Sequence, residues 1–327
     1  LNGFEISATC NTTMIIRENA KLTLTDTSEG QAGKVSNSSV VTIRNNGELV
    51  IEAGDYRKEN IYCMYLGSNS ETIINGGKFG GIYTNGSQTN DCKLTINDGE
   101  FTELLYLAGS GTYKIEDGTF SDVSTNAVIE IRRGTLEING GEFTKEVATA
   151  GNESAEVNGN ASGAYQGVIV VAKKEGYAGD VSVTIKGGTF TNEDGDVIVM
   201  ANETDDLETS LEINGEDVIV NGNITDYSET VASKGITLKS GTVIENNAIA
   251  QIGNSKFNTI EEAIANVENK GTIKLIGNVA LTGAGKYFAD EINNKNECAI
   301  EIEGKEITID LNGFEISATC NTTMIIR

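Results

Sequence analysis

The residues that most often do chemistry in proteins are unevenly represented in this sequence. Its 327 residues include no histidine, five cysteines, and 48 acidic against 24 basic side chains. Without an imidazole, the chain has no Ser-His-Asp or Cys-His nucleophile, no HExxH zinc site and no histidine ligand for haem. The formal net charge of −24 argues against a nucleic-acid partner, because phosphate binding needs a basic surface.

The densest run of carboxylates lies between residues 193 and 217. If the chain folds into stacked strands ~4.8 Å apart, carboxylates from consecutive strands converge well enough to hold a hard cation such as Ca²⁺. The alternative is a solvated acidic face with no bound ion. We favour this alternative and assign no cofactor-binding residue; the candidate calcium ligands are Asp194, Asp196, Asp205 and Asp206.

Two of the five cysteines are spaced for a covalent bond between neighbouring strands. Cys298 and Cys320 are 22 residues apart, a separation that matches the finer repeat of this sequence. Stacked Cα atoms ~4.8 Å apart fall within the ~4.4–6.8 Å range of disulfides. The pair is therefore a disulfide candidate, and the alternative is a column of buried free thiols.

Basic side chains offer little support for catalysis. A calcium-dependent polysaccharide lyase needs an arginine or lysine base beside clustered carboxylates on one strand face. Arg132 and Arg133 lie together at the end of a predicted strand, whereas Arg44 and Arg57 are isolated. No segment matches a lyase or polygalacturonase catalytic motif. We assign no catalytic residue and expect a protein that is not an enzyme.

The sequence contains an identical internal repeat. Residues 1–17 and residues 311–327 both read LNGFEISATCNTTMIIR. Chance does not produce this identity, and convergent packing would leave mismatches at solvent-facing positions. The repeat predicts a tandem array with a period of 310 residues, of which the chain spans one period and a 17-residue overlap. An engineered duplication is the alternative explanation.

A shorter motif recurs within the period: an alternating apolar strand, a glycine, and an aromatic residue two positions later. The steps from Gly54 to Gly77, Gly99, Gly118 and Gly141 are 23, 22, 19 and 23 residues, and the next step, to Gly188, is 47. Glycine supplies a positive-φ bend after each strand, and the aromatic rings of successive coils should stack. The predicted core stack contains Tyr56, Phe79, Phe101, Phe120, Phe143 and Phe190.

These spacings predict an all-β fold, a right-handed parallel β-helix solenoid of about 22 residues per coil. Left-handed β-helices need regular coils of about 18 residues, which the variable steps exclude. The long step indicates two coils, or one coil with a loop insertion around residues 148–163. The absence of proline agrees with strands that bond to coils on both sides.

One segment has helical rather than strand periodicity. Residues 258–267 carry apolar side chains at i, i+3, i+4 and i+7, and a threonine followed three residues later by a glutamate forms a capping box. We expect a short amphipathic helix, one per 310-residue unit, that caps the open end of the solenoid. Its residues are Thr259, Ile260, Glu262, Ala263, Ile264 and Val267.

These elements suggest a division into three parts. Residues 1–247 would form the C-terminal part of one β-helix unit. Residues 248–270 would supply the strand and capping helix that open the next unit, and residues 271–327 would form its first coils. The chain would then begin inside one solenoid and end inside the next.

The segment AQIGNSKFNTIEEAIANVENKGTIKLIGNVALTG, followed by KEITIDLNGFEIS and KLTLTD, resembles the pectin-lyase-like right-handed β-helix repeats of large surface and fibre proteins of Gram-positive bacteria. Members open with a strand-helix-strand of this form and continue with "IDLNG" and "LTIxGGxF" coils. The resemblance implies an extracellular location at the cell surface. It does not select a function, because this fold hosts lyases, adhesins and inert stalks.

The leading hypothesis is a structural repeat of an extracellular bacterial filament or stalk, whose partners are further copies of the same unit. Arrays of identical units gain length or avidity from their copy number. One alternative is an adhesin for host or environmental glycans, with a binding face of Tyr62, Tyr65, Tyr83 and Tyr106; another is a calcium-dependent polysaccharide lyase-like enzyme. No apolar run reaches the ~18 residues of a membrane span.

Overall fold

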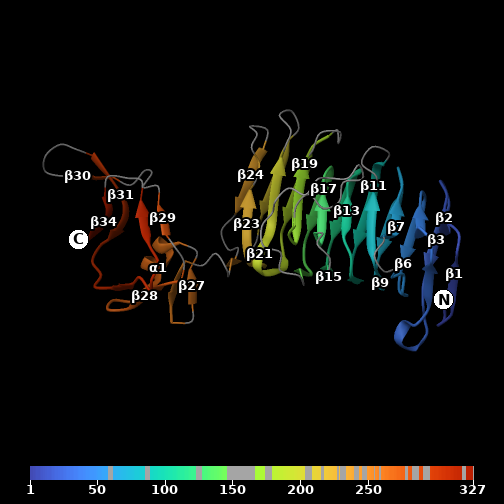
Figure 1. Cartoon of the computed structure of the whole chain (residues 1–327), viewed down its shortest axis with the longest axis horizontal. Helices are drawn as coiled ribbons and strands as arrows, with labels where there is room; N and C mark the ends of the chain where they lie inside the picture. Colours follow the sequence, from blue (N-terminus) through green and yellow to red (C-terminus); the bar gives the residue numbers. More distant parts are fainter. Residues whose placement is uncertain are drawn as a thin grey trace. The chain divides into compact units, whose positions relative to one another are not determined.

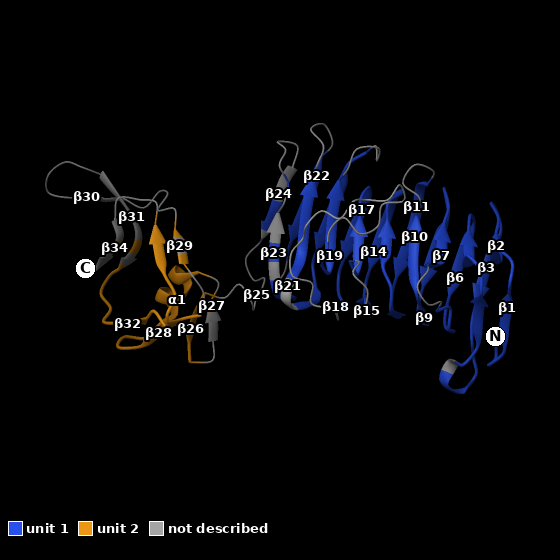
Figure 2. Cartoon of the chain, in the orientation of Figure 1, with its two compact units in different colours: residues 1–243 blue, residues 244–327 orange. Residues whose placement is uncertain are grey.

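The structure is a computed structural model in two compact units, Leu1–Val243 (unit 1) and Ile244–Arg327 (unit 2), shown in Figure 2. The expected loop insertion around residues 148–163 lies outside the described residues. The structure describes residues 1–57, 62–84, 89–122, 127–145, 166–173, 179–202, 208–214, 217–226, 228, 233–238, 243–244, 249–253, 255–257, 259–276, 279–281, 287–289, 295–318 and 322–326.

Unit 1 is built from parallel strands arranged in three columns (Figure 1). Each column is a stack of strands from successive coils, and the chain adds one strand to each column in turn. Within the second and third columns, a strand pairs with the strands one coil earlier and one coil later. In the first column, isolated bridges from Asp55 to Lys34 and Lys78 take the place of a strand in one coil. This arrangement follows from the sequence pattern: alternating side chains leave one apolar face on each strand, and a bend after each strand redirects the chain. A short 3-10 helix, η1 (Glu29–Gln31), lies between the first two coils.

The first column contains β1 (Glu5–Ala8), β4 (Lys34–Asn37), β9 (Lys78–Phe79), β12 (Glu100–Phe101), β15 (Thr119–Asp122) and β18 (Glu142–Lys145). The second contains β2 (Thr12–Ile16), β5 (Val41–Asn45), β7 (Tyr62–Leu66), β10 (Gly81–Thr84), β13 (Leu105–Leu107), β16 (Ile129–Ile131) and β19 (Ile169–Lys173). The third contains β3 (Lys21–Leu24), β6 (Glu48–Ile51), β8 (Glu71–Ile74), β11 (Asn90–Ile96), β14 (Ser110–Ile115), β17 (Gly134–Ile138), β20 (Val181–Ile185), β22 (Thr209–Ile213) and β24 (Ser233–Leu238).

Two long strands, β21 (Gly188–Asn202) and β23 (Val218–Asp226), run through both the first and the second column. The short strand β25 (Val243–Ile244) pairs with β23. The described part of the chain is therefore mostly strand, with long parallel sheets. These sheets confirm the prediction of an all-β chain and are consistent with a parallel solenoid.

An aromatic stack runs along the first column. Its six rings, from Tyr56 to Phe190, are all fully buried. Neighbouring ring centroids are 4.6–5.2 Å apart and their planes lie within 14° of parallel. This spacing is close to the ~4.8 Å between hydrogen-bonded strands, so the backbone ladder itself brings the rings into contact.

The motif glycines make room for these rings. Gly141 has a φ of 109°, a conformation that side-chain-bearing residues rarely adopt. A Cβ added there would lie 3.0 Å from the carbonyl oxygen of Gly118 and 3.1 Å from the ring of Phe143. The bend and the close approach of successive coils therefore both require glycine at this position.

Unit 2 packs a short helix, α1 (Ile260–Asn266), against its first strands. The hydroxyl of Thr259 accepts a hydrogen bond of 3.1 Å from the amide of Glu262 and so caps the helix. Ile260, Ala263 and Val267 are buried in one apolar cluster with strand residues of the unit. The strands are β26 (Ala250–Ile252), β27 (Ser255–Phe257), β28 (Thr272–Leu275), β29 (Val279–Leu281), β30 (Tyr287–Ala289), β31 (Lys295–Ile302), β32 (Thr308–Asp310), β33 (Ile316–Ala318) and β34 (Thr322–Ile326).

We predict that Phe120→Ala lowers the stability of unit 1 by about 3–5 kcal/mol, because it opens a cavity between two stacked rings. Urea unfolding followed by circular dichroism measures this as a lower midpoint. Thr119→Ala, on the exposed side of the same strand, is the matched control and should change the midpoint little. Equal effects of the two substitutions would contradict a core held by this stack.

Candidate functional site

The sheets of unit 1 end in an edge formed by β1, β2 and β3. Among the described residues, each of these strands pairs on one side alone, with β4, β5 and β6 respectively. Unpaired strand edges are sites where further strands add. Large apolar side chains are exposed here, including Phe4 (73 %), Ile6 (45 %) and Ile15 (48 %).

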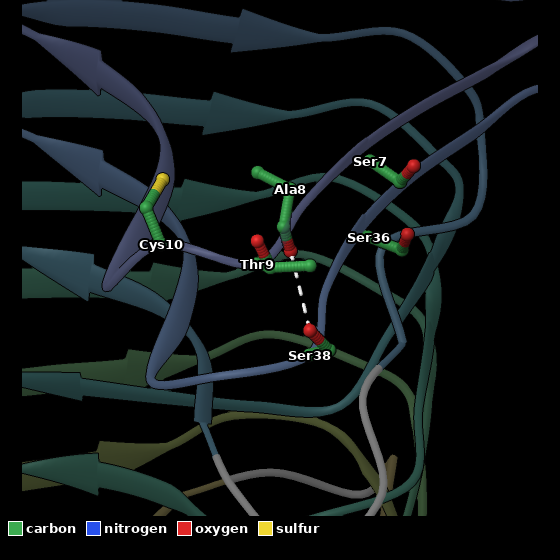
Figure 3. A pocket seen from close by; sticks show the side chains of 6 residues that line it. All are labelled: Ser7, Ala8, Thr9, Cys10, Ser36 and Ser38. Atoms are coloured by element: carbon green, nitrogen blue, oxygen red, sulfur yellow. Dashed lines mark hydrogen bonds between the residues drawn. The ribbon is translucent and has the colours of Figure 1, made fainter.

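A shallow pocket opens beside this edge (Figure 3). Its wall comes from β1 and β4 with the turns that follow them, and the hydroxyl of Ser38 donates a hydrogen bond of 3.5 Å to the carbonyl of Ala8. The lining residues are Ser7, Ala8, Thr9, Cys10, Ser36 and Ser38. Among the described residues, this lining is small and neutral and includes no acid or base that could activate the Cys10 thiol or a serine hydroxyl.

Asp26 ties this edge to the next coil. Its carboxylate, 4 % exposed, accepts hydrogen bonds from the backbone amides of Gly3 (3.0 Å) and Gly33, and from the amide and hydroxyl of Ser28. Burial acts to raise the pKa of the Asp26 carboxyl, but these hydrogen bonds outweigh it and lower the pKa to about 2. Asp26 therefore remains ionised at neutral pH and clamps the turn that precedes β1.

The outer side of the second column carries fully buried charges. Glu130 alternates along β16 with the core residues Ile129 and Ile131 and so faces away from the core. Its carboxylate accepts a hydrogen bond of 2.6 Å from Nε of Arg132, and Nζ of Lys173 donates to the backbone carbonyl of Arg132 at 3.2 Å. All three charged side chains are fully buried. The Glu130–Arg132 pair lies within one coil, whereas the bond from Lys173 links two neighbouring coils.

The tyrosines proposed for glycan binding do come together. The rings of Tyr62 and Tyr83 lie 4.6 Å apart, and those of Tyr65 and Tyr83 lie 4.9 Å apart. Tyr106 occupies the register position next to Tyr83 on the following coil. However, Tyr65 and Tyr106 are buried and the other two are half-buried. The cluster is therefore largely covered, and sugar stacking needs exposed ring faces.

The arginines considered for catalysis all contact other side chains. The Arg44 guanidinium lies 4.3 Å from the centre of the Tyr65 ring. Arg57 forms an ion pair with Asp55 at 2.8 Å. Arg133 donates to the side chain of Asn90 at 3.2 Å. Arg57 also lies 3.7 Å from the carboxylate of Glu100, and Arg132 is buried against Glu130. In the part of the chain that the structure describes, neither arginine lies beside a group of three acids that could hold a calcium ion.

The calcium candidates fall largely outside the described residues. Asp205 and Asp206 lie outside them, as does the side chain of Asp194, whereas Asp196 lies in β21. Within the described ranges, no group of three or more cysteine, aspartate or glutamate side chains is close enough to hold a metal ion. Calcium binding by this segment stays a prediction.

The predicted disulfide also stays a prediction. In the β31–β34 ladder, Cys298 pairs with Thr322, and Cys320 lies outside the described residues. Among the described cysteines, Cys63 and Cys92 are buried free thiols and Cys10 is an exposed one. Burial raises the pKa of the Cys63 thiol to about 12 and also raises that of Cys92, so both are unreactive in the folded protein.

Two polar features were not predicted from the sequence. The side-chain amide of Asn97 donates to that of Asn75 at 2.7 Å one coil earlier, and Asn75 in turn donates to Glu52. Buried Asp122 and Lys145, also one coil apart, form an ion pair of 3.2 Å. Two sequence signals could have revealed these contacts. The Ile-Asn pair recurs in the motif, and the opposite charges of Asp122 and Lys145 lie 23 residues apart, about one coil.

Comparisons with known proteins add no relative. No protein-family model, no curated protein and no solved structure matches the chain. Among the described residues, no helix has the length and apolar character needed to cross a membrane.

We predict that the clamp at Asp26 weakens in acid. A carboxyl with a pKa of about 2 in the folded state and about 3.9 when unfolded stabilises the fold fully above pH ~4 and loses this contribution as the pH falls toward 2. The melting temperature of Asp26→Asn should thus fall below that of the parent at pH 6, and the difference should shrink near pH 2. Glu29→Gln, at an exposed neighbouring acid, should match the parent at both pH values.

Proposed function

We propose that the chain is a structural repeat of an extracellular filament or stalk on a bacterial surface. Its units would be right-handed parallel β-helices stacked end to end, without catalytic activity. The partners would be further copies of the same unit. This proposal joins the repeated sequence to a fold whose sheets grow along one axis by adding strands.

The observation that carries the proposal is the stretch of seventeen residues that occurs twice, 310 positions apart. In unit 1 it forms β1 and β2, and in unit 2 its copy forms β33 and β34. A solenoid gains strength and length by continuing its ladders, so a repeated strand-forming stretch is what a continuing array needs. A binding protein or an enzyme has no comparable need for it.

The chemistry of the described side chains supports a structural role over the alternatives. The strongest interactions are internal: a ring stack, buried ion pairs and ladders of side-chain amides. The half-covered tyrosine cluster is a poor platform for a glycan, and the arginines contact rings, carboxylates or amides. We therefore propose that the function depends on stacking along the axis of the solenoid, and not on ligand binding or catalysis at its outer faces.

The dimensions of such a filament follow from strand spacing. About 13 coils at ~4.8 Å each give about 60–65 Å of axis per period. The overlap contributes Glu315 and Arg327, which cancel, so −24 is also the charge of one period. This amounts to about one negative charge per ~2.6 Å, compared with ~1.7 Å for duplex DNA. A rod of this charge density repels its neighbours and condenses cations.

Electron microscopy of the native particle tests the proposal directly. We expect long thin rods with an axial repeat of about 60–65 Å, since one period comprises about 13 coils. Compact single particles without an axial repeat would contradict it. They would instead identify the duplication as an isolated feature of this chain.

We also predict that the rods bundle in a cation-dependent way. Neighbouring rods of like charge associate only when cations screen or bridge them, and divalent ions act at lower concentration than monovalent ones. Pelleting in millimolar Ca²⁺, with and without a chelator, measures this, and a series of NaCl concentrations separates bridging from screening. Bundling that responds to neither would show that charge does not control lateral contacts.

A further inference from the structure

The two copies of the repeated stretch have the same local backbone. We call residues 1–17 and 311–327 the seam stretch. Both copies form a turn closed by a backbone hydrogen bond, from the amide of Phe4 to Leu1 in one and from Phe314 to Leu311 in the other. The φ angles in this turn are 51° and 79° at Asn2 and Gly3, and 46° and 87° at Asn312 and Gly313. The conformation therefore belongs to the stretch and not to its surroundings.

The two copies differ in which neighbour they pair with. In unit 1 the seam stretch pairs with the coil that follows it: β1 with β4 and β2 with β5. In unit 2 it pairs with the coil that precedes it: β33 with β29 and β34 with β31. All four pairings are parallel. Within the described residues, each copy thus leaves open the edge that the other copy uses.

The two sets of pairings use different backbone atoms. In unit 1 the carbonyls of Phe4 and Ala8 accept hydrogen bonds from Lys34 and Ser38, at 3.0 and 3.1 Å. In unit 2 it is the carbonyl of Glu315, the counterpart of Glu5, that accepts a bond, from Val279 at 2.8 Å. Alternate residues of a strand in a parallel sheet bond to opposite neighbours. One seam stretch can therefore bond to both neighbours at once.

Side chains also continue across such a junction. In the first column, Val279 pairs with Ile316, whose counterpart Ile6 pairs with Val35. In the second column, Ile300 pairs with Met324, whose counterpart Met14 pairs with Ile43. In each of these two rows of paired side chains, the residues on either side of the seam stretch are buried: Val279 and Val35 in the first, and Ile300 and Ile43 in the second. Joined through one seam stretch, the rows become unbroken apolar ladders.

The exposed residues of unit 1 show what this junction would cover. Phe4 is 73 % and Ile6 45 % exposed at the open edge. Their counterparts Phe314 and Ile316 pack against the apolar cluster of unit 2, which contains Val279 and Ile300. The same side chains are therefore partly buried where β29 and β31 precede them.

We propose that the edge formed by β1 and β2 is a docking surface for the edge formed by β29 and β31 of a second copy of this chain, with one seam stretch between them. The proposal rests on the filament function and adds the partner surface and its register. Head-to-tail contacts that do not close into a ring extend into filaments. It follows that β33 and β34 occupy the edge of β29 and β31 within one chain, and that they compete for this edge with β1 and β2 of another chain.

The test uses the full chain and sedimentation velocity. Ile316→Lys with Met324→Lys loosens residues 311–327 from β29 and β31 while leaving residues 1–17 intact, so this variant should associate more strongly than the parent as concentration rises. Adding Ile6→Lys should weaken that association about tenfold or more, because it buries an unpaired charge against Val279. Adding Ser7→Lys instead, on the solvent side of the same strand, should leave the association unchanged.

Two results would overturn the proposal. In the first, the variant with Ile316→Lys and Met324→Lys stays monomeric although residues 272–302 keep their protease resistance. In the second, that variant associates equally strongly with and without Ile6→Lys. If the double substitution removes that resistance, Met324→Ala alone replaces it in the same comparison. If native rods form and Ile6→Lys does not affect them, the filament function is supported but the pairing of β1 and β2 with β29 and β31 is wrong. Association through these strands without native rods would reject the filament instead.

Discussion

The parallel hydrogen-bond ladder between successive coils is the interaction on which the rest of this structure depends. It holds each strand ~4.8 Å from its neighbours, and this distance also lets flat rings stack and side-chain amides bond along the axis. The ring spacing of 4.6–5.2 Å in the aromatic stack is therefore a consequence of backbone geometry. Proline is absent because every strand inside the stack uses its backbone donors.

A ladder of this kind leaves unpaired strands at its edges, and the side chains at the edge formed by β1 and β2 differ in character from the charged composition of the chain. The chain as a whole carries a net charge of −24. At the N-terminal edge, apolar side chains such as Phe4 and Ile6 are exposed instead. In the proposed filament, repulsion between like-charged rods and burial of the exposed apolar residues would both favour growth along the axis over lateral aggregation. The clamp at Asp26 keeps that end ordered by tying Gly3 to the second coil.

Much of the core could be predicted from the sequence, because residues that recur at intervals of about one coil come to lie next to one another in the stack. The recurring glycine and aromatic pair placed Tyr56 to Phe190 in one column, and the spacing of apolar residues located the helix after Thr259. The candidate sites on the outer faces were less predictable. Tyr106 is buried in an apolar cluster with Ala127 and Val170 of later coils, and the composition of its own strand does not reveal these neighbours.

By itself, the sequence determined the local conformations: the turn at Asn2 and Gly3, the alternation within strands, and the repeated stretch of seventeen residues. These depend on steric limits at single residues and on side-chain periodicity, so they are the same wherever the stretch occurs. Tertiary structure alone decided which strands pair, since residues 1–17 bond forward and their copies bond backward. It also decided that Glu130, Arg132 and Lys173 meet out of water. The physical reason is that pairing and burial depend on which coil lies alongside, and this is set by the whole stack.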